Sequence, residues 1–265
     1  MCLAVIALAA HPRYALVVAT NRDEFHARPA TPATWGSDGA FAGILAGRDE
    51  QAGGTWLGVD RRGRVAFVTN VRQGTGRDPA ARSRGELALR VLQAHAPLGD
   101  TLAAIAHEGA SYNGFNLLAA DVAEAAWVSN RTAGVHAVAP GIHGLSNAAL
   151  DTPWPKVLRT KAALADWCAR GTDDVEALFI ALADRTGAAD ADLPATGVSL
   201  AWERILAAPF IVSADYGTRC STVLTIDRAG TARFEERSFG ADSRPAGIRS
   251  EVFDVDRRIP LDGAP

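Results

Sequence analysis

The chain opens with two apolar runs inside residues 1–25, MCLAVIALAAHPRYALVVATNRDEF. The runs, 2–10 and 14–20, are rich in strand-forming residues and are separated by His11-Pro12-Arg13, where proline ends a strand and supplies a turn. This spacing predicts a β-hairpin in which the numbers of opposite residues sum to about 24. Cys2 would then lie opposite Arg22, and a slip of one residue would bring it opposite Asn21 or Asp23.

Working outward from this hairpin, alternating strand and helix patterns cover most of the chain. The further strands are expected at 41–46, 55–59, 65–70, 115–120, 125–129, 135–138, 142–145, 210–213, 221–226, 233–237 and 251–255. The helices are expected at 82–94, 101–107, 153–170 and 173–184. This order favours an α+β fold, a four-layer αββα sandwich of two antiparallel sheets covered by helices, formed as a single domain over 1–265. A generic α+β fold of unknown layering is the alternative.

Composition narrows the class of protein. The 265 residues are 48% hydrophobic and 22% charged, which is ordinary for a folded protein, and the net charge of −3 without a basic block argues against nucleic-acid binding. Three cysteines are too few for a disulfide framework, and neither they nor the six histidines have the spacing of a metal site. Residues 3–10 lack the basic flank of a signal peptide, so we expect a cytoplasmic protein without a membrane-spanning segment. The oligomeric state stays open.

Cys2 is the candidate nucleophile, because the predicted register gives it polar neighbours. A cation such as Arg22 lowers the pKa of a thiol, and a carboxylate such as Asp23 can bind an α-ammonium group. If Met1 is removed, the α-amine of Cys2, with a pKa of about 7.7 to 8.0, could act as its base. A retained Met1 would block that amine. The alternative is that Cys2 is a small apolar residue of a buried strand and that residues 21–24 are merely solvated.

Other residues could contact a ligand. Asn70, at a strand end, could donate to an oxyanion or cap a turn. Trp56 lies two residues after Gly53-Gly54. These glycines could let a ligand approach the backbone N–H groups, or they could form a tight turn. Arg48 and Arg72 could meet an anionic group, although solvated arginines are the common case. No metal site is expected, but a single histidine could ligate a haem iron.

Several motifs together resemble the NRDE family, the transport and Golgi organisation family. They are Met1-Cys2-Leu3, Asn21-Arg22-Asp23-Glu24-Phe25, Arg28-Pro29, Ala46-Gly47-Arg48-Asp49, Gly53-Gly54-Thr55-Trp56-Leu57-Gly58, Thr69-Asn70-Val71-Arg72, Arg82-Ser83-Arg84-Gly85, Tyr112-Asn113-Gly114-Phe115-Asn116-Leu117, Leu145-Ser146-Asn147 and Tyr216-Gly217-Thr218-Arg219. The blocks extend from residue 1 to about 225, so the resemblance covers most of the chain.

That family in turn resembles the N-terminal nucleophile hydrolases of the penicillin V acylase and choloylglycine hydrolase type. The resemblance implies an αββα sandwich and carries the catalytic roles onto Cys2, Asp23, Asn147 and Arg219. One departure stands out. Those hydrolases have an arginine three residues before the aspartate, where this chain has Thr20, and here an arginine, Arg22, immediately precedes Asp23.

Two functions are therefore expected as alternatives. In the first, Cys2 attacks a small acylated amide or acyl thioester as a hydrolase or acyltransferase, and no cofactor is required. Asp23 and Arg219 would orient Cys2, Asn70 or Asn147 would hold the oxyanion, and Arg22 would lower the thiol pKa or bind a substrate carboxylate. The residues expected to bind the substrate are Asn21, Glu24, Arg48, Trp56 and Arg72. In the second, the same pocket binds haem or acyl-coenzyme A without turnover, as the family's links to haem trafficking and lipid metabolism imply.

Overall fold

A computed structural model describes residues 3–72, 74 and 76–256 and contains two antiparallel sheets. The first, sheet A, has the order β10 (Gly141–Leu145), β1 (Leu3–Leu8), β2 (Tyr14–Phe25), β11 (Tyr216–Asp227), β12 (Thr231–Phe239) and β13 (Pro245–Asp254). The second, sheet B, has the order β3 (Ala30–Trp35), β4 (Ile44–Asp49), β5 (Leu57–Asp60), β6 (Val65–Asn70), β7 (Phe115–Ala120), β8 (Ala125–Ser129) and β9 (Thr132–Ala137).

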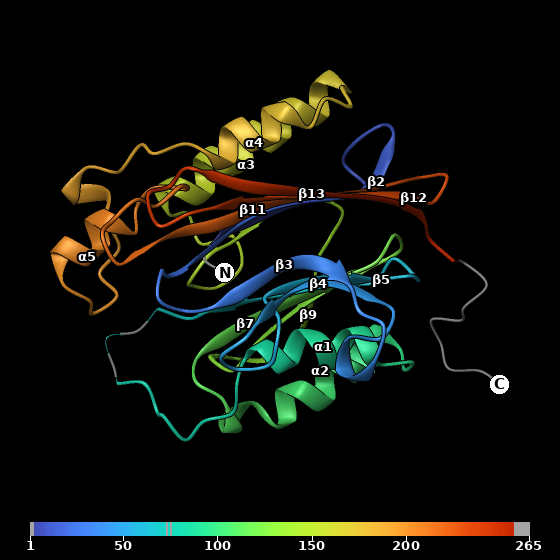
Figure 1. Cartoon of the computed structure of the whole chain (residues 1–265), viewed down its shortest axis with the longest axis horizontal. Coiled ribbons are helices and arrows are strands. Elements are labelled where there is room, and N and C mark those ends of the chain that lie inside the picture. Colours follow the sequence, from blue (N-terminus) through green and yellow to red (C-terminus); the bar gives the residue numbers. More distant parts are fainter. Residues whose placement is uncertain (1–2, 73, 75, 257–265) are drawn as a thin grey trace.

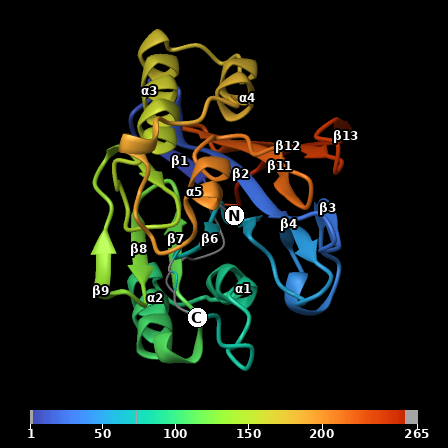
Figure 2. The same cartoon turned by 90° about the vertical axis from the view of Figure 1, so that its left-hand side faces the viewer.

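Helices cover the outer face of each sheet, which gives the predicted four layers (Figures 1 and 2). Sheet A carries α3 (Pro155–Arg170) and α4 (Glu176–Leu182), and sheet B carries α1 (Gly85–Gln93) and α2 (Leu98–His107). A short helix, α5 (Leu200–Ile205), lies beyond one end of sheet A (Figure 1). In the described part of the chain, single turns of 3-10 helix occur at η1 (Gly39–Phe41), η2 (Gly109–Ser111) and η3 (Asp190–Asp192).

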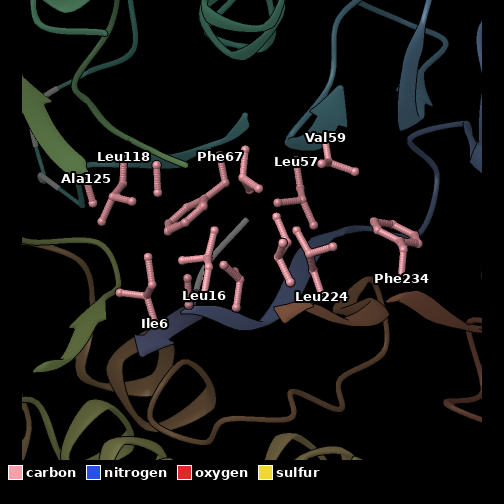
Figure 3. Packing of buried hydrophobic residues seen from close by; sticks show 14 of the residues in the cluster. Ile6, Leu16, Leu57, Val59, Phe67, Leu118, Ala125, Leu224 and Phe234 are labelled. Atoms are coloured by element: carbon pink, nitrogen blue, oxygen red, sulfur yellow. The ribbon is translucent and has the colours of Figure 1, made fainter. Parts of the chain in front are cut away.

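The main core lies between the two sheets and follows from the alternation of side chains along each strand. Ile6, Leu16 and Leu224 of sheet A face Leu57 and Phe67 of sheet B (Figure 3). The intervening residues of β1 and β2, such as Val5 and Val17, pack instead beneath α3 and α4. Both faces of these strands are thus buried, which explains why their sequences read as continuous apolar runs.

The predicted hairpin register is confirmed over the described residues. Leu3 pairs with Asn21 and Leu8 pairs with Leu16, and each pair sums to 24. The predicted partner of Arg22, Cys2, lies outside the described residues, as does Met1. On its other edge β1 pairs with β10, with Ala4 opposite Leu145. The start of β1 therefore lies between the end of β2 and the end of β10.

Several expected elements were wrong or missing. Strand β3 was not predicted because Pro32 interrupts its sequence, but β3 is an edge strand with a bulge between Thr31 and Thr34, where a missing N–H is tolerated. The expected strand at 210–213 is absent, and only an isolated bridge joins Val212 to Gly217. Helix α5 was also missed, since six residues are too few to show a helical period. Strand β4 begins and ends three residues later than expected, and β11 and β13 begin earlier.

Within the described ranges, no helix has the length and apolarity needed to cross a membrane.

Candidate active site

Arg22 lies near the end of β2 and faces the space between the sheets. Its guanidinium lies 4.2 Å from the ring centroid of Trp56, and the residue is only 4% exposed. Trp56 in turn packs on Gly47, where a Cβ atom would come within 2.4 Å of the indole. Among the residues that the structure describes, no carboxylate forms an ion pair with Arg22. The site thus contains a nearly buried cation held mainly by an aromatic face, which is typical of a cation–π contact.

Asp23 points to the opposite face of β2 and is held by β11. Its Oδ1 accepts a hydrogen bond of 2.6 Å from the hydroxyl of Thr218, which itself accepts one from the N–H of Ile211. Asp23 is 3% exposed. A chain of hydrogen bonds therefore fixes the orientation of this carboxylate, as a catalytic or amine-binding carboxylate requires.

Arg219 lies at a bulge in β11, because Thr218 pairs with Asp23 and Cys220 pairs with Arg22. Its Nη1 donates to the carbonyl oxygens of Phe25, His26 and Arg28, at 3.1 to 3.3 Å. Its Nε is buried and has no acceptor in the described part of the chain. Burial, together with the nearby charge of Arg22, lowers the pKa of the Arg219 guanidinium. Two guanidinium groups thus lie near each other where β2 and β11 meet.

Asn147 belongs to the loop after β10, and hydrogen bonds join this loop to the end of β6. Its Nδ2 donates to the carbonyl oxygen of Asn70 at 2.8 Å, and the Thr69 hydroxyl donates to the carbonyl oxygen of Ser146. The side-chain amide of Asn147, which was expected to donate to an oxyanion, therefore donates to Asn70. Asn70 takes part as an acceptor, through its backbone carbonyl oxygen. Asn116 donates to the carbonyl oxygen of Ala148 and completes this connection between the two sheets.

Arg72 lies next to this loop in a buried ion pair. Its Nη1 is 2.6 Å from Glu203 of α5, with side chains that are 8% and 4% exposed. The N–H of Arg72 donates to the carbonyl oxygen of Asn147, and its guanidinium lies over the ring of Trp154. The structure thus places this arginine, which was expected to bind substrate, in the framework that holds Asn147.

Two other predicted residues, Asn21 and Arg48, lie apart from the arginine pair. Asn21 is fully buried on the outer face of sheet A, where its amide donates to the carbonyl oxygens of Leu182 and Pro209. Arg48 stacks on Phe41, which belongs to the core beneath α1 and α2. Glu24, by contrast, lies near the pair, where its negative charge acts to raise the pKa of Arg219. It is partly exposed, accepts from the N–H of Phe25 and lies 3.7 Å from Arg28. The contacts of Asn21 anchor the fold, because they join β2 to the segment around α4.

The sequence did not predict a further group of buried polar side chains, which lies near Arg22 between the two sheets. Glu236 of β12 is 1% exposed, and its Oε1 accepts from the N–H of Ala33 in sheet B at 2.8 Å. Cys220, the strand partner of Arg22, is also buried and interacts with this carboxyl group. Glu236 lies two residues after Phe234 in β12 and therefore faces the core, as Phe234 does. A charged residue at such a position was the only indication in the sequence.

Glu236 leads to a prediction about pH dependence. Burial raises its pKa, although the N–H of Ala33, the Cys220 thiol and the charge of Arg22 favour the ionised form. The folded protein therefore holds the proton of the Glu236 carboxyl group more tightly than the unfolded chain does, where a glutamate has a pKa of about 4.3. The free energy of unfolding falls as the pH rises from about 4.3 to the raised pKa of Glu236, and it levels off above that pKa.

We therefore expect Glu236→Gln to flatten this part of the profile and to raise the free energy of unfolding at pH 7 relative to the wild type. Urea unfolding between pH 4 and pH 8 measures the effect. A Glu236→Gln protein that loses stability at pH 7, relative to the wild type, would contradict it.

The fold is that of the N-terminal nucleophile hydrolases. An N-acylethanolamine-hydrolyzing acid amidase ortholog of Caenorhabditis elegans matches 84% of this chain and 92% of its own, with a TM-score of 0.52 and 11% identity. A mutant conjugated bile acid hydrolase of Clostridium perfringens matches 99% of this chain and 94% of its own, with a TM-score of 0.50 and 9% identity. At these identities the likeness shows the fold alone.

The chain belongs to the Transport and Golgi organisation 2 family, TANGO2, which matches residues 1–241. A Transport and Golgi organization protein 2 homolog of Bos taurus is 37% identical over 245 residues, 86% of this chain and 88% of the relative. The Homo sapiens homolog is 35% identical over 240 residues, 85% of this chain and 87% of the relative. The family resemblance drawn from the sequence motifs is confirmed.

Proposed function

We propose that this protein is a Cys2-dependent hydrolase or acyltransferase that acts on a small acylated amide or acyl thioester. The observation that carries the proposal is the strand order β10-β1-β2-β11, in which the start of β1 is flanked by Asn147 on one side and by Arg22, Asp23 and Arg219 on the other. Cys2 lies outside the described residues. Its proposed site comes from carrying the observed pairing, with its sum of 24, one residue further.

The proposed reaction uses the groups at this end of sheet A. The Cys2 thiolate forms a bond to the acyl carbon, and the C–N or C–S bond to the leaving group breaks as the α-amine returns the thiol proton to it. Asp23 holds that amine in place. Arg22 stabilises the thiolate, and water or an acceptor then releases the acyl group from sulfur. The names of the two structural neighbours, an amidase and a bile acid hydrolase, support this class of reaction by analogy.

A non-catalytic binding function is the second candidate, and the arginine pair favours it. Arg22 and Arg219 suit a carboxylate or phosphate group, such as a propionate of haem or the phosphates of acyl-coenzyme A. For haem, the turn that Arg219 holds also carries His26, whose Nδ1 is buried and has no partner among the described atoms. Haem, if bound here, would supply an iron that an imidazole can ligate.

Mass spectrometry of untagged protein tests the catalytic proposal. We expect the intact mass to lack Met1, and incubation with octanoyl-coenzyme A or an N-octanoyl amide to add one octanoyl group on Cys2. Cys2→Ala is the control and is expected to show no adduct. Quantitative retention of Met1 would overturn the mechanism, because the α-amine would then be blocked. Retention of octanoyl-coenzyme A or of haem that is unaffected by Cys2→Ala, without an adduct, would favour the binding function.

A further inference from the structure

Strand β13 forms one edge of sheet A and is long and regular for an edge strand. It has 10 residues, and its pairing with β12 runs without a shift from Thr231–Asp254 to Ser238–Gly247. The other edge strands described, β10, β3 and β9, have five or six residues, and Pro32 and a bulge interrupt β3. Proteins usually shorten, bend or cover their edge strands, because an exposed edge is a template for pairing with another chain.

No described element covers the outer edge of β13. Helices α3 and α4 pack on β10, β1, β2 and β11, and β13 lies at the side of sheet A away from α3 (Figure 2). After Asp254 the chain turns toward sheet B, where the N–H of Asp256 donates to the carbonyl oxygen of Arg61. Within the described ranges only β12 pairs with β13, so the N–H and C=O groups along the other edge are available to a further strand.

The side chains of β13 are complementary to a second copy of the same strand. Its centre reads Ile248-Arg249-Ser250-Glu251-Val252. When two copies lie antiparallel with Ser250 opposite itself, Arg249 lies opposite Glu251 and Ile248 lies opposite Val252, and symmetry forms each pair twice. Ile248 and Val252 share one face of the strand and are 63% and 62% exposed. The alignment would therefore bury four apolar side chains on one face and join two ion pairs on the other.

The alternative alignments are less favourable. Two-fold symmetry keeps opposite residues on the same face of the sheet, so the neighbouring symmetric registers centre on Arg249 or on Glu251. Either register places two like charges directly opposite each other, which is destabilising. Within the described part of the chain neither Arg249 nor Glu251 forms an ion pair, so both charges are available to a partner. Charge therefore selects the register centred on Ser250.

We propose that two copies of this chain associate through β13 and form one continuous antiparallel sheet across a symmetric dimer. A second copy is the occupant that the strand itself specifies, because both members of each complementary pair lie on β13. The contact of one strand edge is small compared with a typical stable interface, so the dimer is expected to depend on protein concentration. The inference is independent of the chemistry proposed at Cys2.

Exchange of charges tests the proposed register. Sedimentation velocity of the full chain, from micromolar to submillimolar concentration, is expected to show a monomer–dimer equilibrium. Arg249→Glu alone and Glu251→Arg alone each place like charges in both pairs, and each is expected to weaken association by at least about tenfold. The double variant is expected to restore it. An equimolar mixture of the two single variants is also expected to dimerise, because each pair between unlike copies then carries opposite charges.

Two matched comparisons locate the interface on β13. Ile248→Thr is expected to weaken the dimer, whereas Ile180→Thr is expected to leave it unchanged, because Ile180 is 67% exposed but lies on α4. Ser250→Cys is expected to form a disulfide between copies on oxidation, since directly opposite Cα atoms are about 4.5 to 5.5 Å apart. Asp254→Cys is the control and is expected to form none. Mass spectrometry of the linked peptide identifies the bond.

Three outcomes would overturn the inference. The first is a wild type that stays monomeric through the whole concentration range. The second is a dimer that both single charge variants leave unchanged, since association would then use another surface. The third is a mixture of the two single variants that stays monomeric although each variant is folded by circular dichroism. Recovery in the mixture cannot come from a structural role of either residue within one copy, so it would support the paired strands directly.

Discussion

Replacing Arg22 with glutamine is expected to slow the alkylation of Cys2 by iodoacetamide at pH 7 by about tenfold, the effect of raising a thiol pKa by about one unit. The physical reason is the loss of a cation beside the thiol in a nearly buried place, where charges interact more strongly than in water. Arg22→Lys keeps the charge and is expected to keep most of the reactivity. The rate is followed by mass spectrometry of the N-terminal peptide.

The chain offers a matched control for this experiment. Arg48 is also an arginine near an aromatic ring, Phe41, but it lies on the face of sheet B that α1 covers, so Arg48→Gln is expected to leave the rate unchanged. The other thiols contribute little, because burial raises the pKa of Cys168 to about 11 and that of Cys220 well above its usual value. Equal rates for wild type, Arg22→Gln and Arg48→Gln would refute the predicted pairing of Cys2 with Arg22.

Replacing Glu203 with glutamine is expected to lower the free energy of unfolding by about 3 kcal/mol. The Arg72–Glu203 pair is almost fully buried, and removing one partner leaves a guanidinium that is desolvated and without its counter-charge. The carboxylate also accepts from the N–H and the hydroxyl of Thr196, which fixes the segment before α5. Denaturant unfolding measures the change.

Two further variants separate this effect from a general sensitivity to charge. Asp166→Asn removes a partner of Arg170 in an exposed pair on α3 and is expected to have no measurable effect. The double variant Arg72→Met with Glu203→Leu is expected to recover much of the lost stability, because it removes both buried charges together. A double variant that is less stable than Glu203→Gln would contradict the explanation by desolvation.

The sequence predicts much of the fold because its signals are local. A proline turn between two apolar runs was enough for the register of β1 and β2, which the pairing of Leu3 with Asn21 confirms. Strand alternation also separates Arg22 from Asp23, and this could have been read from the same run of residues. The irregular pieces, β3 with Pro32 and the short α5, could not be predicted because tertiary contacts rather than local preferences stabilise them.

The site was less predictable, because its polar groups are joined over long distances in the chain. Arg72 pairs with Glu203, 131 residues away, and Thr218 donates to Asp23, 195 residues away. No local pattern indicates such a partner, so Arg72 resembled a free anion-binding arginine. Asn21 was similarly ambiguous, since a motif does not reveal which of its four polar residues anchors the fold.

The bulge in β11 has a consequence for sequence changes at this position. Thr218 pairs with Asp23 and Cys220 with Arg22, so a chain without residue 219 could form an uninterrupted ladder at this point. Arg219 is therefore an insertion that the strand does not need for its own pairing, and its removal would leave the alternation of both flanking segments intact. Bulges of this kind re-aim single side chains beside functional sites. Deletion of residue 219 is therefore expected to remove the arginine while the fold is kept.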